Sequence, residues 1–216
     1  RFVDNLGYGE ILTGRWEGGL PVAPYQSREQ RAYGATFRAT RLLWTSCSAG
    51  PLDRPVFDTN FREGDALFGL ADVECCVSGT FYEGFPEISS LRQHPTLGAA
   101  FDGMLEPLEH LKSGEREPVQ PLQVLVFVSG FNNCVYDSLK TLGQLCSLSN
   151  FPVNVLPVVF SWPCGSLPSF FNTKSIAESP QLQEAFISFV TTLRAKLGSV
   201  TIDVLAHSQG CRAMMN

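Results

Sequence analysis

The sequence has few charged residues and no concentration of positive charge. Charged residues make up 17% of its 216 residues, against roughly 25% in an average soluble domain. The 16 Lys and Arg against 21 Asp and Glu leave a formal net charge of −5. The densest basic stretch, from Arg28 to Arg41, spreads four arginines over fourteen positions and is typical of a solvated segment. We therefore expect no nucleic-acid partner, because such a surface needs a basic patch.

Long hydrophobic runs are also missing. No apolar run reaches the roughly 18 residues that a membrane-spanning helix needs, so we expect no integral membrane segment. The start, Arg1–Asp4, has neither an initiator Met nor a signal-peptide pattern, which predicts that the sequence is a fragment of a longer protein.

The seven cysteines form no C-x-x-C pair, and their odd number fits no complete disulfide framework. We interpret them as buried reduced thiols, which favours a reducing, cytoplasmic compartment. We expect no metal site and no cofactor.

Apolar residues, in contrast, are plentiful. Hydrophobic residues make up 44% of the chain and aromatic residues 11%, which is enough for the core of one domain, with or without an appendage. Residues 1–118 are expected to form an N-terminal extension that mixes strands with irregular segments. Short apolar bursts between Pro55 and Thr80 predict short strands, and an apolar stripe predicts one helix over Thr96–Leu111, kinked or split at Pro107.

Residues 119–216 alternate short apolar strands with helices. The expected strands are buried runs at Leu122–Val128, Val153–Phe160 and Val200–Leu205. One helix should end near Leu148, and a second should begin after Ser179 as N-cap and end before Gly198. Cys164–Ile176 reads as a loop, and its Phe170 and Phe171 are expected in the core rather than in a lipid-contact patch, while a role lining the mouth of a site stays open. This alternation predicts βαβ units, and therefore an α/β fold with a parallel sheet between helices.

Ser208 is the residue whose surroundings in the sequence indicate a chemical role. It stands between the last strand and a new helix, with Ala206 two residues before it and Gly210 two residues after it. Small residues at these positions let the backbone turn sharply, so that the serine hydroxyl projects above the end of the sheet. The same turn points the N–H of Gln209 toward an oxyanion at the N-terminus of the helix.

A serine at the start of a helix is more often a simple N-cap, and the pentapeptide alone favours that interpretation. The preceding chain reverses the preference. The strand ending at Val128 leads into Ser129-Gly130-Phe131, where an α/β-hydrolase places its oxyanion loop, in the order along the chain that the fold requires. We therefore favour Ser208 as a nucleophile.

Three segments carry a resemblance to a known family. They are Val126–Asn133 (VFVSGFNN), Val159–Pro163 (VFSWP) and Val204–Gly210 (VLAHSQG) followed by Arg212. The chain is similar to the esterase/lipase-like branch of the α/β-hydrolase superfamily that is catalogued as a domain of unknown function. The resemblance covers about Leu122–Asn216 and implies the N-terminal part of an α/β-hydrolase sheet, truncated after the nucleophile turn.

The resemblance also implies roles for single residues. Ser208 would be the nucleophile, and the backbone N–H groups of Gln209 and Phe131 would form the oxyanion hole. His207, Gly210, Ala206, Gly130 and Ser129 would support the turn and the loop, with His207 packing there and not acting as the base.

Two positions depart from the family pattern. Ser129 stands where a histidine is usual, and a hydroxyl cannot reach as far to brace the oxyanion loop. Asn172 replaces a residue that is often acidic. The fold also places an acid and a histidine after the nucleophile, but neither occurs after Ser208, and His94 and His110 precede it. We expect that the chain stops within the domain and has little hydrolase activity by itself.

Three functions remain open at this stage. The parent protein is interpreted as a serine hydrolase acting on a small-molecule or lipid ester or a related acyl bond. The alternative is a catalytically silent, hydrolase-like protein used for binding or assembly. A lipid-binding or acyl-transfer protein would differ from the first only in the acceptor.

Overall fold

The structure is a computed structural model that describes residues 3–4, 16–17, 20–21, 36–50, 52, 56–78, 86–109, 121–149, 151–152, 154–165 and 169–215. The strands are β1 (Val3–Asp4), β2 (Trp16–Glu17), β3 (Leu20–Pro21), β4 (Thr36–Ser46), β5 (Leu67–Ser78), β6 (Glu87–His94), β7 (Gln123–Val128), β8 (Val155–Ser161) and β9 (Thr201–Ala206). The helices are α2 (Leu97–Glu109), α3 (Val135–Leu148), α4 (Phe170–Ala177), α5 (Pro180–Leu197) and α6 (Gln209–Met215).

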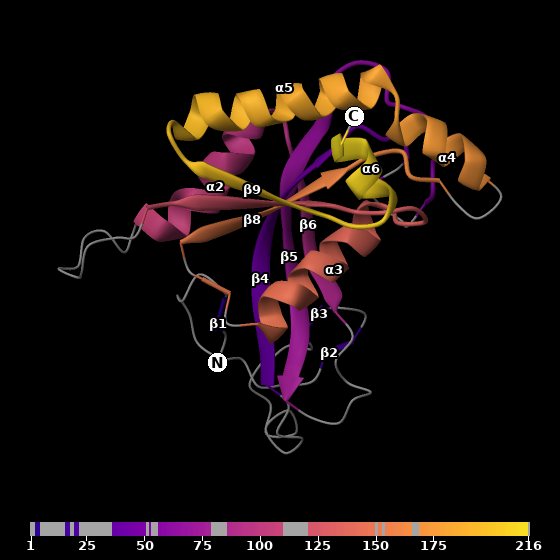
Figure 1. Cartoon of the computed structure of the whole chain (residues 1–216). Helices are drawn as coiled ribbons and strands as arrows, with labels where there is room; N and C mark the ends of the chain where they lie inside the picture. Colours follow the sequence, from indigo (N-terminus) through magenta and orange to yellow (C-terminus); the bar gives the residue numbers. More distant parts are fainter. Residues whose placement is uncertain are drawn as a thin grey trace.

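One mixed sheet organises these elements, with the strand order β6-β5-β4-β8-β7-β9 and β1 beside β4 (Figure 1). β4, β8, β7 and β9 are parallel to one another, whereas β5 and β6 pair antiparallel beyond β4. From β7 onward the chain alternates strands and helices, which confirms the predicted α/β class. The carboxyl ends of β7, β8 and β9 therefore meet at one edge of the sheet, which is where such folds place ligands.

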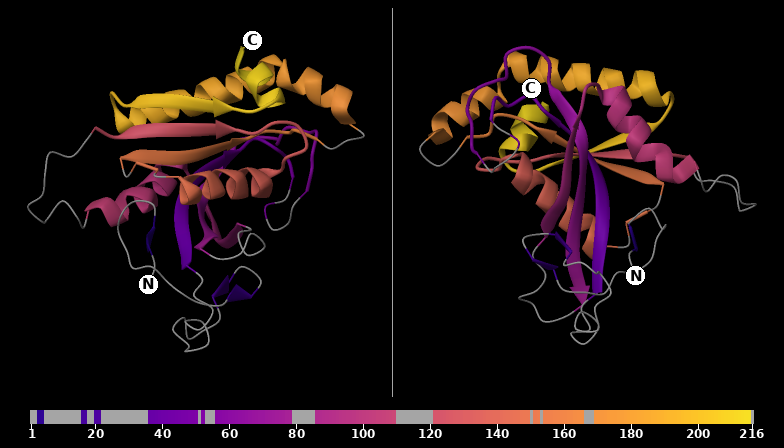
Figure 2. Two further views of the ribbon diagram at one scale, coloured as in Figure 1. Left: turned by 60° about the horizontal axis from the view of Figure 1, so that its bottom comes forward. Right: turned by 180° about the vertical axis from the view of Figure 1, so that it is seen from behind.

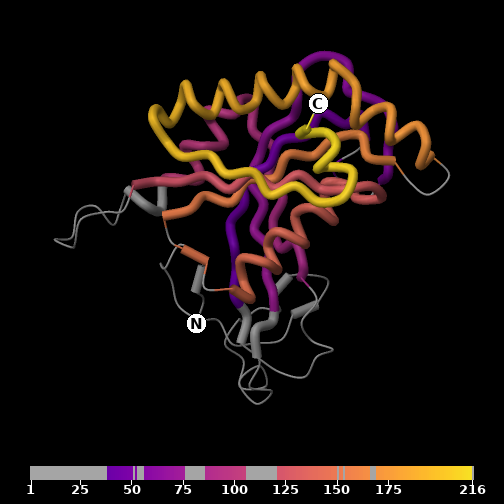
Figure 3. Tube along the Cα trace, in the orientation of Figure 1, coloured from indigo at the N-terminus to yellow at the C-terminus, as the bar shows by residue number. Residues whose placement is uncertain are grey.

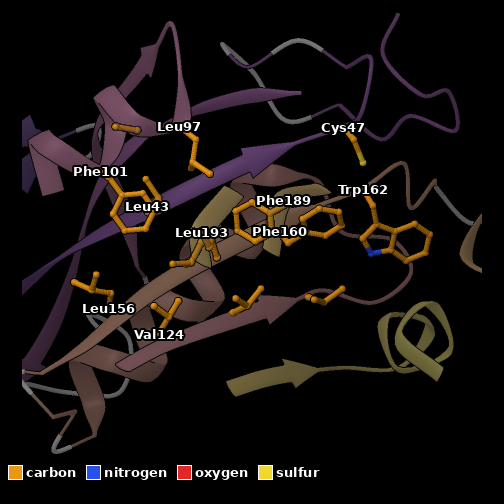
Figure 4. Close-up of a cluster of buried hydrophobic side chains, with 14 of the residues drawn as sticks. Leu43, Cys47, Leu97, Phe101, Val124, Leu156, Phe160, Trp162, Phe189 and Leu193 are labelled. Atoms are coloured by element: carbon orange, nitrogen blue, oxygen red, sulfur yellow. The ribbon is translucent and has the colours of Figure 1, made fainter. Parts of the chain in front are cut away.

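Helices cover both faces of the sheet (Figures 1 and 2). On one face, α2 and α5 bury Phe101 and Phe189 against the strands, and the rings of Phe189 and Phe160 lie 5.5 Å apart (Figure 4). On the other face, α3 packs Leu139 and Leu142 in a second apolar cluster with residues of β4 and β5. Each fully buried side chain of this kind contributes roughly 1.5–3 kcal/mol of transfer free energy.

The helix with the strongest local signals forms as predicted. α5 begins at Pro180, and the hydroxyl of Ser179 accepts a hydrogen bond from the backbone N–H of Leu182 at 3.3 Å. It ends at Leu197, where Gly198 takes a left-handed φ of 71°. The cap and the final glycine are local features, so the sequence could define both ends.

The part of the chain before residue 118 contributes longer strands than expected. β4 and β5 have 11 and 12 residues, and β5 runs without a break where the apolar bursts predicted separate short strands. Helix α2 is not split at Pro107 and continues to Glu109. The predicted boundary between residues 118 and 119 lies outside the described residues, and β4, before it, pairs with β8, after it, in the same sheet.

Three expectations for the second half were wrong. β9 was predicted to be buried, but it lies at the edge of the sheet, exposes Val204 and Leu205 and, among the described strands, pairs only with β7. Residues from Phe170 to Ala177 form helix α4 rather than a loop, and Phe170 and Phe171 are exposed rather than in the core.

Candidate active site

Ser208 lies in the turn that joins β9 to α6. Figure 3 shows this part of the chain as the yellow end of the tube. Its φ is 55°, a left-handed value that is uncommon for a residue other than glycine. The residue is exposed, and its hydroxyl makes no hydrogen bond with any other residue that the structure describes. An N-cap serine has an extended backbone and accepts a bond from its own helix, so the geometry of Ser208 does not fit that role.

The turn is held against the end of β7. The backbone N–H of His207 donates to the carbonyl of Val128 at 3.1 Å. Gly210 sits where the new helix crosses the strand, and a Cβ there would lie 2.6 Å from the carbonyl oxygens of both Val128 and Ser129. Because backbone oxygens cannot move aside easily, only a glycine fits at position 210.

The loop that follows β7 reaches the turn from the other side. A Cβ at Gly130 would lie 2.7 Å from the Cβ of Ser208 and 2.8 Å from the carbonyl oxygen of His207. The N–H groups of Phe131 and Gln209 donate to no other residue in the described ranges. Two backbone donors therefore remain available on the two segments that meet at Ser208.

Three hydrogen bonds tie this loop to the segment after β8. The indole N–H of the buried Trp162 donates to the carbonyl of Ser129 at 2.8 Å. The N–H of Asn132 donates to the carbonyl of Cys164 at 3.3 Å, and Asn132 itself has a left-handed φ of 58°. The thiol of Cys164 donates to the carbonyl of Asn133. The sequence contains the segment around Trp162 as a motif but gives it no role. Its hydrogen-bond partners lie 31 to 33 residues earlier in the chain, and these contacts form only when the chain is folded.

Inside the loop, the side-chain amide of Asn133 donates to the carbonyl of Phe131 at 3.0 Å. The hydroxyl of Ser129, in contrast, is buried and makes no hydrogen bond among the described residues. The backbone of Ser129 is held instead by the hydrogen bond from the indole N–H of Trp162.

Neither of the two histidines that the structure describes is placed as a base for Ser208. His207 turns its imidazole toward Gly130, with Nδ1 3.0 Å from the position of a Cβ there. His94 ends β6, which is the strand at the opposite edge of the sheet from β9. His110 lies outside the described residues.

Three of the cysteines near the site, Cys47, Cys134 and Cys164, are buried thiols, whereas Cys211 in α6 is partly exposed. Burial raises the pKa of Cys164 and of Cys47 to about 12, and that of Cys134 to about 11. A thiol with such a pKa stays protonated at neutral pH and is a poor nucleophile. Among the described residues, no group of three or more His, Cys, Asp or Glu side chains is arranged to hold a metal ion.

Helix α4 lies beside α6 and near the loop that follows β7 (Figures 1 and 2). Arg212 of α6 forms an ion pair with Glu178, the residue that follows α4. The ring of Phe131 meets that of Phe170 edge to face, with centroids 5.0 Å apart. The phenylalanine at the start of α4 therefore lies at the border of the candidate site, next to the loop that follows β7.

No helix in the described ranges is long and apolar enough to span a membrane. No curated protein and no solved structure matches the chain significantly. Residues 109–216, half of the chain, match the family described as alpha/beta hydrolase of unknown function (DUF900). This match agrees with the α/β fold of the sheet and with the resemblance of the three motifs. The chain therefore belongs to this family of α/β-hydrolases.

Proposed function

We propose that the chain carries the nucleophile half of a serine hydrolase that cleaves a carboxylic ester or a related acyl bond. The observation that carries the proposal is the backbone of Ser208, left-handed and exposed at a strand-to-helix turn. On the segments that meet there, two backbone N–H groups donate to no residue that the structure describes. Strained backbone of this kind is kept where a side chain must be held in one position.

In this proposal the hydroxyl of Ser208 attacks the carbonyl carbon of the substrate. The N–H groups of Gln209 and Phe131 stabilise the negative charge that develops on the carbonyl oxygen. The first of these donors lies at the N-terminus of α6, where the helix dipole favours a negative charge. Gly130 leaves room for the substrate carbonyl because it places no side chain over Ser208.

The proton of Ser208 needs a base. His207 packs against Gly130 and His94 lies at the far edge of the sheet, so we propose that a histidine downstream of Ser208 in the longer protein takes this role, together with an acidic residue. The substrate is a small-molecule or lipid ester, and the reaction needs no cofactor.

The test uses an alkyl fluorophosphonate probe, which phosphonylates activated serines, on the full-length protein. We expect labelling of the wild type and no labelling of Ser208→Ala. Ser188→Ala, which removes an exposed serine on α5, serves as the matched control and should label like the wild type.

The same experiment decides for or against the alternative, a catalytically silent protein that serves binding or assembly. That alternative draws support from Ser129, whose hydroxyl stands in place of the usual histidine and makes no hydrogen bond among the described residues. Absence of labelling in a folded wild type would favour it.

A further inference from the structure

Three phenylalanines form a row of touching rings that leads away from the oxyanion loop. The centroids of Phe131 and Phe170 are 5.0 Å apart, and those of Phe170 and Phe171 are 5.7 Å apart, both with edge-to-face geometry. Phe170 is 42% exposed and Phe171 83% exposed. The row therefore begins beside the candidate oxyanion donor and ends in solvent.

The exposure of these rings follows from how α4 is seated. The helix buries Thr173 and Ala177, and it exposes Phe170, Phe171, Asn172 and Lys174. Its core contact is thus made by Thr173, Ala177 and the partly buried Ile176, while its two phenylalanines are exposed. Apolar side chains grouped next to a candidate site indicate a surface that an apolar ligand covers.

Two contacts place the row on the substrate side of Ser208. Phe131 directly follows Gly130, which touches Ser208. The ion pair between Arg212 and Glu178 joins the end of α4 to α6, the helix that begins after Ser208. No acidic residue lies within α4, so no carboxylate of that helix opposes an apolar chain or the carboxylate of a bound fatty acid.

We propose that Phe131, Phe170 and Phe171 form the acyl-chain site of this protein, and that its ligands are esters of medium-chain or longer fatty acids. This inference rests on the proposed function for the identity of the reacting bond. It adds the substrate class, because a row of rings binds a longer acyl chain more tightly than a shorter one by covering more of its methylene groups. Each methylene that is fully covered strengthens binding about fourfold.

The experiment measures binding of hexanoate and decanoate, below their micelle-forming concentrations, to the full-length protein by calorimetry. Ser208→Ala is used as the host so that no chemistry occurs. We expect decanoate to bind at least tenfold more tightly than hexanoate, since its four additional methylenes are partly covered. In Phe171→Ser this ratio should fall to about threefold or less.

Ile187→Ser is the matched control, because Ile187 is 63% exposed on α5 and belongs to no part of the row. It should keep the ratio of the host protein. An unchanged ratio in Phe171→Ser would overturn the proposal. The proposal would also be overturned if Phe171→Ser changed only the sedimentation behaviour of the protein, because the row would then be a contact between two copies of the chain.

The two proposals fail separately. If the wild type is not labelled by a fluorophosphonate but the decanoate ratio depends on Phe171, the acyl-chain site stands and the hydrolase does not. If Ser208 is labelled but the ratio of decanoate to hexanoate affinity does not depend on Phe171, the proposed hydrolase activity holds and the acyl group of the substrate binds at another place.

Discussion

Gly130 lies so close to Ser208 that a side-chain carbon on Gly130 would approach the Cβ of Ser208 to 2.7 Å. The two residues are 78 positions apart in the sequence, at the ends of the neighbouring parallel strands β7 and β9. The contact joins the loop with one candidate donor, at Phe131, to the turn with the other, at Gln209. The geometry of the candidate site depends on this approach.

Gly130→Ala should therefore displace Ser208 without unfolding the protein. A misplacement of about 1 Å at a reacting group can cost on the order of a hundredfold in rate, so we expect fluorophosphonate labelling to slow by about tenfold or more. Gly98→Ala is the control, because a Cβ at Gly98 meets nothing closer than 3.7 Å. Labelling of Gly130→Ala at the wild-type rate would show that the approach has no role in reactivity.

Gly210→Val tests the close contact between the start of α6 and the end of β7. The new side chain would collide with the carbonyl oxygens of Val128 and Ser129, at 2.6 Å for its first carbon alone. Overpacking of this kind costs roughly 1–3 kcal/mol, and more where the obstacle is backbone. Denaturant unfolding should show this loss for Gly210→Val and a smaller one for Gly98→Val. Equal stability of Gly210→Val and the wild type would contradict the close crossing of α6 and β7.

Trp162→Phe tests the tie between the oxyanion loop and β8. The substitution removes the indole N–H that donates to the carbonyl of Ser129 and leaves a buried acceptor without its partner. We expect a loss of about 1–3 kcal/mol in the free energy of unfolding, together with slower labelling of Ser208.

Trp44→Phe provides the matched comparison for this substitution. Trp44 is equally buried, but its indole N–H has no hydrogen-bond partner among the described residues. Its replacement loses no hydrogen bond and should leave the labelling rate unchanged. Equal effects of the two substitutions would mean that Trp162 acts through packing alone.

Glu74 on β5 should make stability depend on pH. It is 6% exposed, and burial raises the pKa of its carboxyl from 4.5 to about 8, with Ser89 lowering the pKa and the charge of Asp72 raising it. Because the folded state holds this proton more tightly than the unfolded state, the contribution of Glu74 to stability is largest below pH 4.5 and is lost as the pH rises toward 8. Glu74→Gln should reduce this fall, measured by urea unfolding at pH 5 and pH 8. An identical pH dependence of the variant and the wild type would contradict the assignment.

Sequence patterns predicted the elements whose signals are local. The cap at Ser179, the proline after it and Gly198 defined α5, and the apolar run ending at Val128 defined β7. The strands β4 and β5 are different, because their partners lie far away in the sequence. Arg41 on β4, for example, reads as a solvated charge, but it is paired with Asp72 on β5 at 2.7 Å.

The candidate site divides in the same way. The spacing of Ala206, Ser208 and Gly210 indicated a sharp turn, because small residues around a serine have a local steric meaning. The support from Trp162 and the row that continues into Phe171 depend on which strands become neighbours. Two adjacent phenylalanines before polar residues give no apolar stripe of helical period, so neither α4 nor the exposure of its rings followed from the sequence.

The central claim is that the hydroxyl of Ser208 is chemically activated in the full-length protein. Mass spectrometry of proteolytic peptides after reaction with a fluorophosphonate measures this directly, because the adduct stays on the serine that reacted. We predict a single modified residue, Ser208. Modification of a different serine, or no modification of the folded protein while a known serine hydrolase in the same tube reacts fully, would contradict the claim.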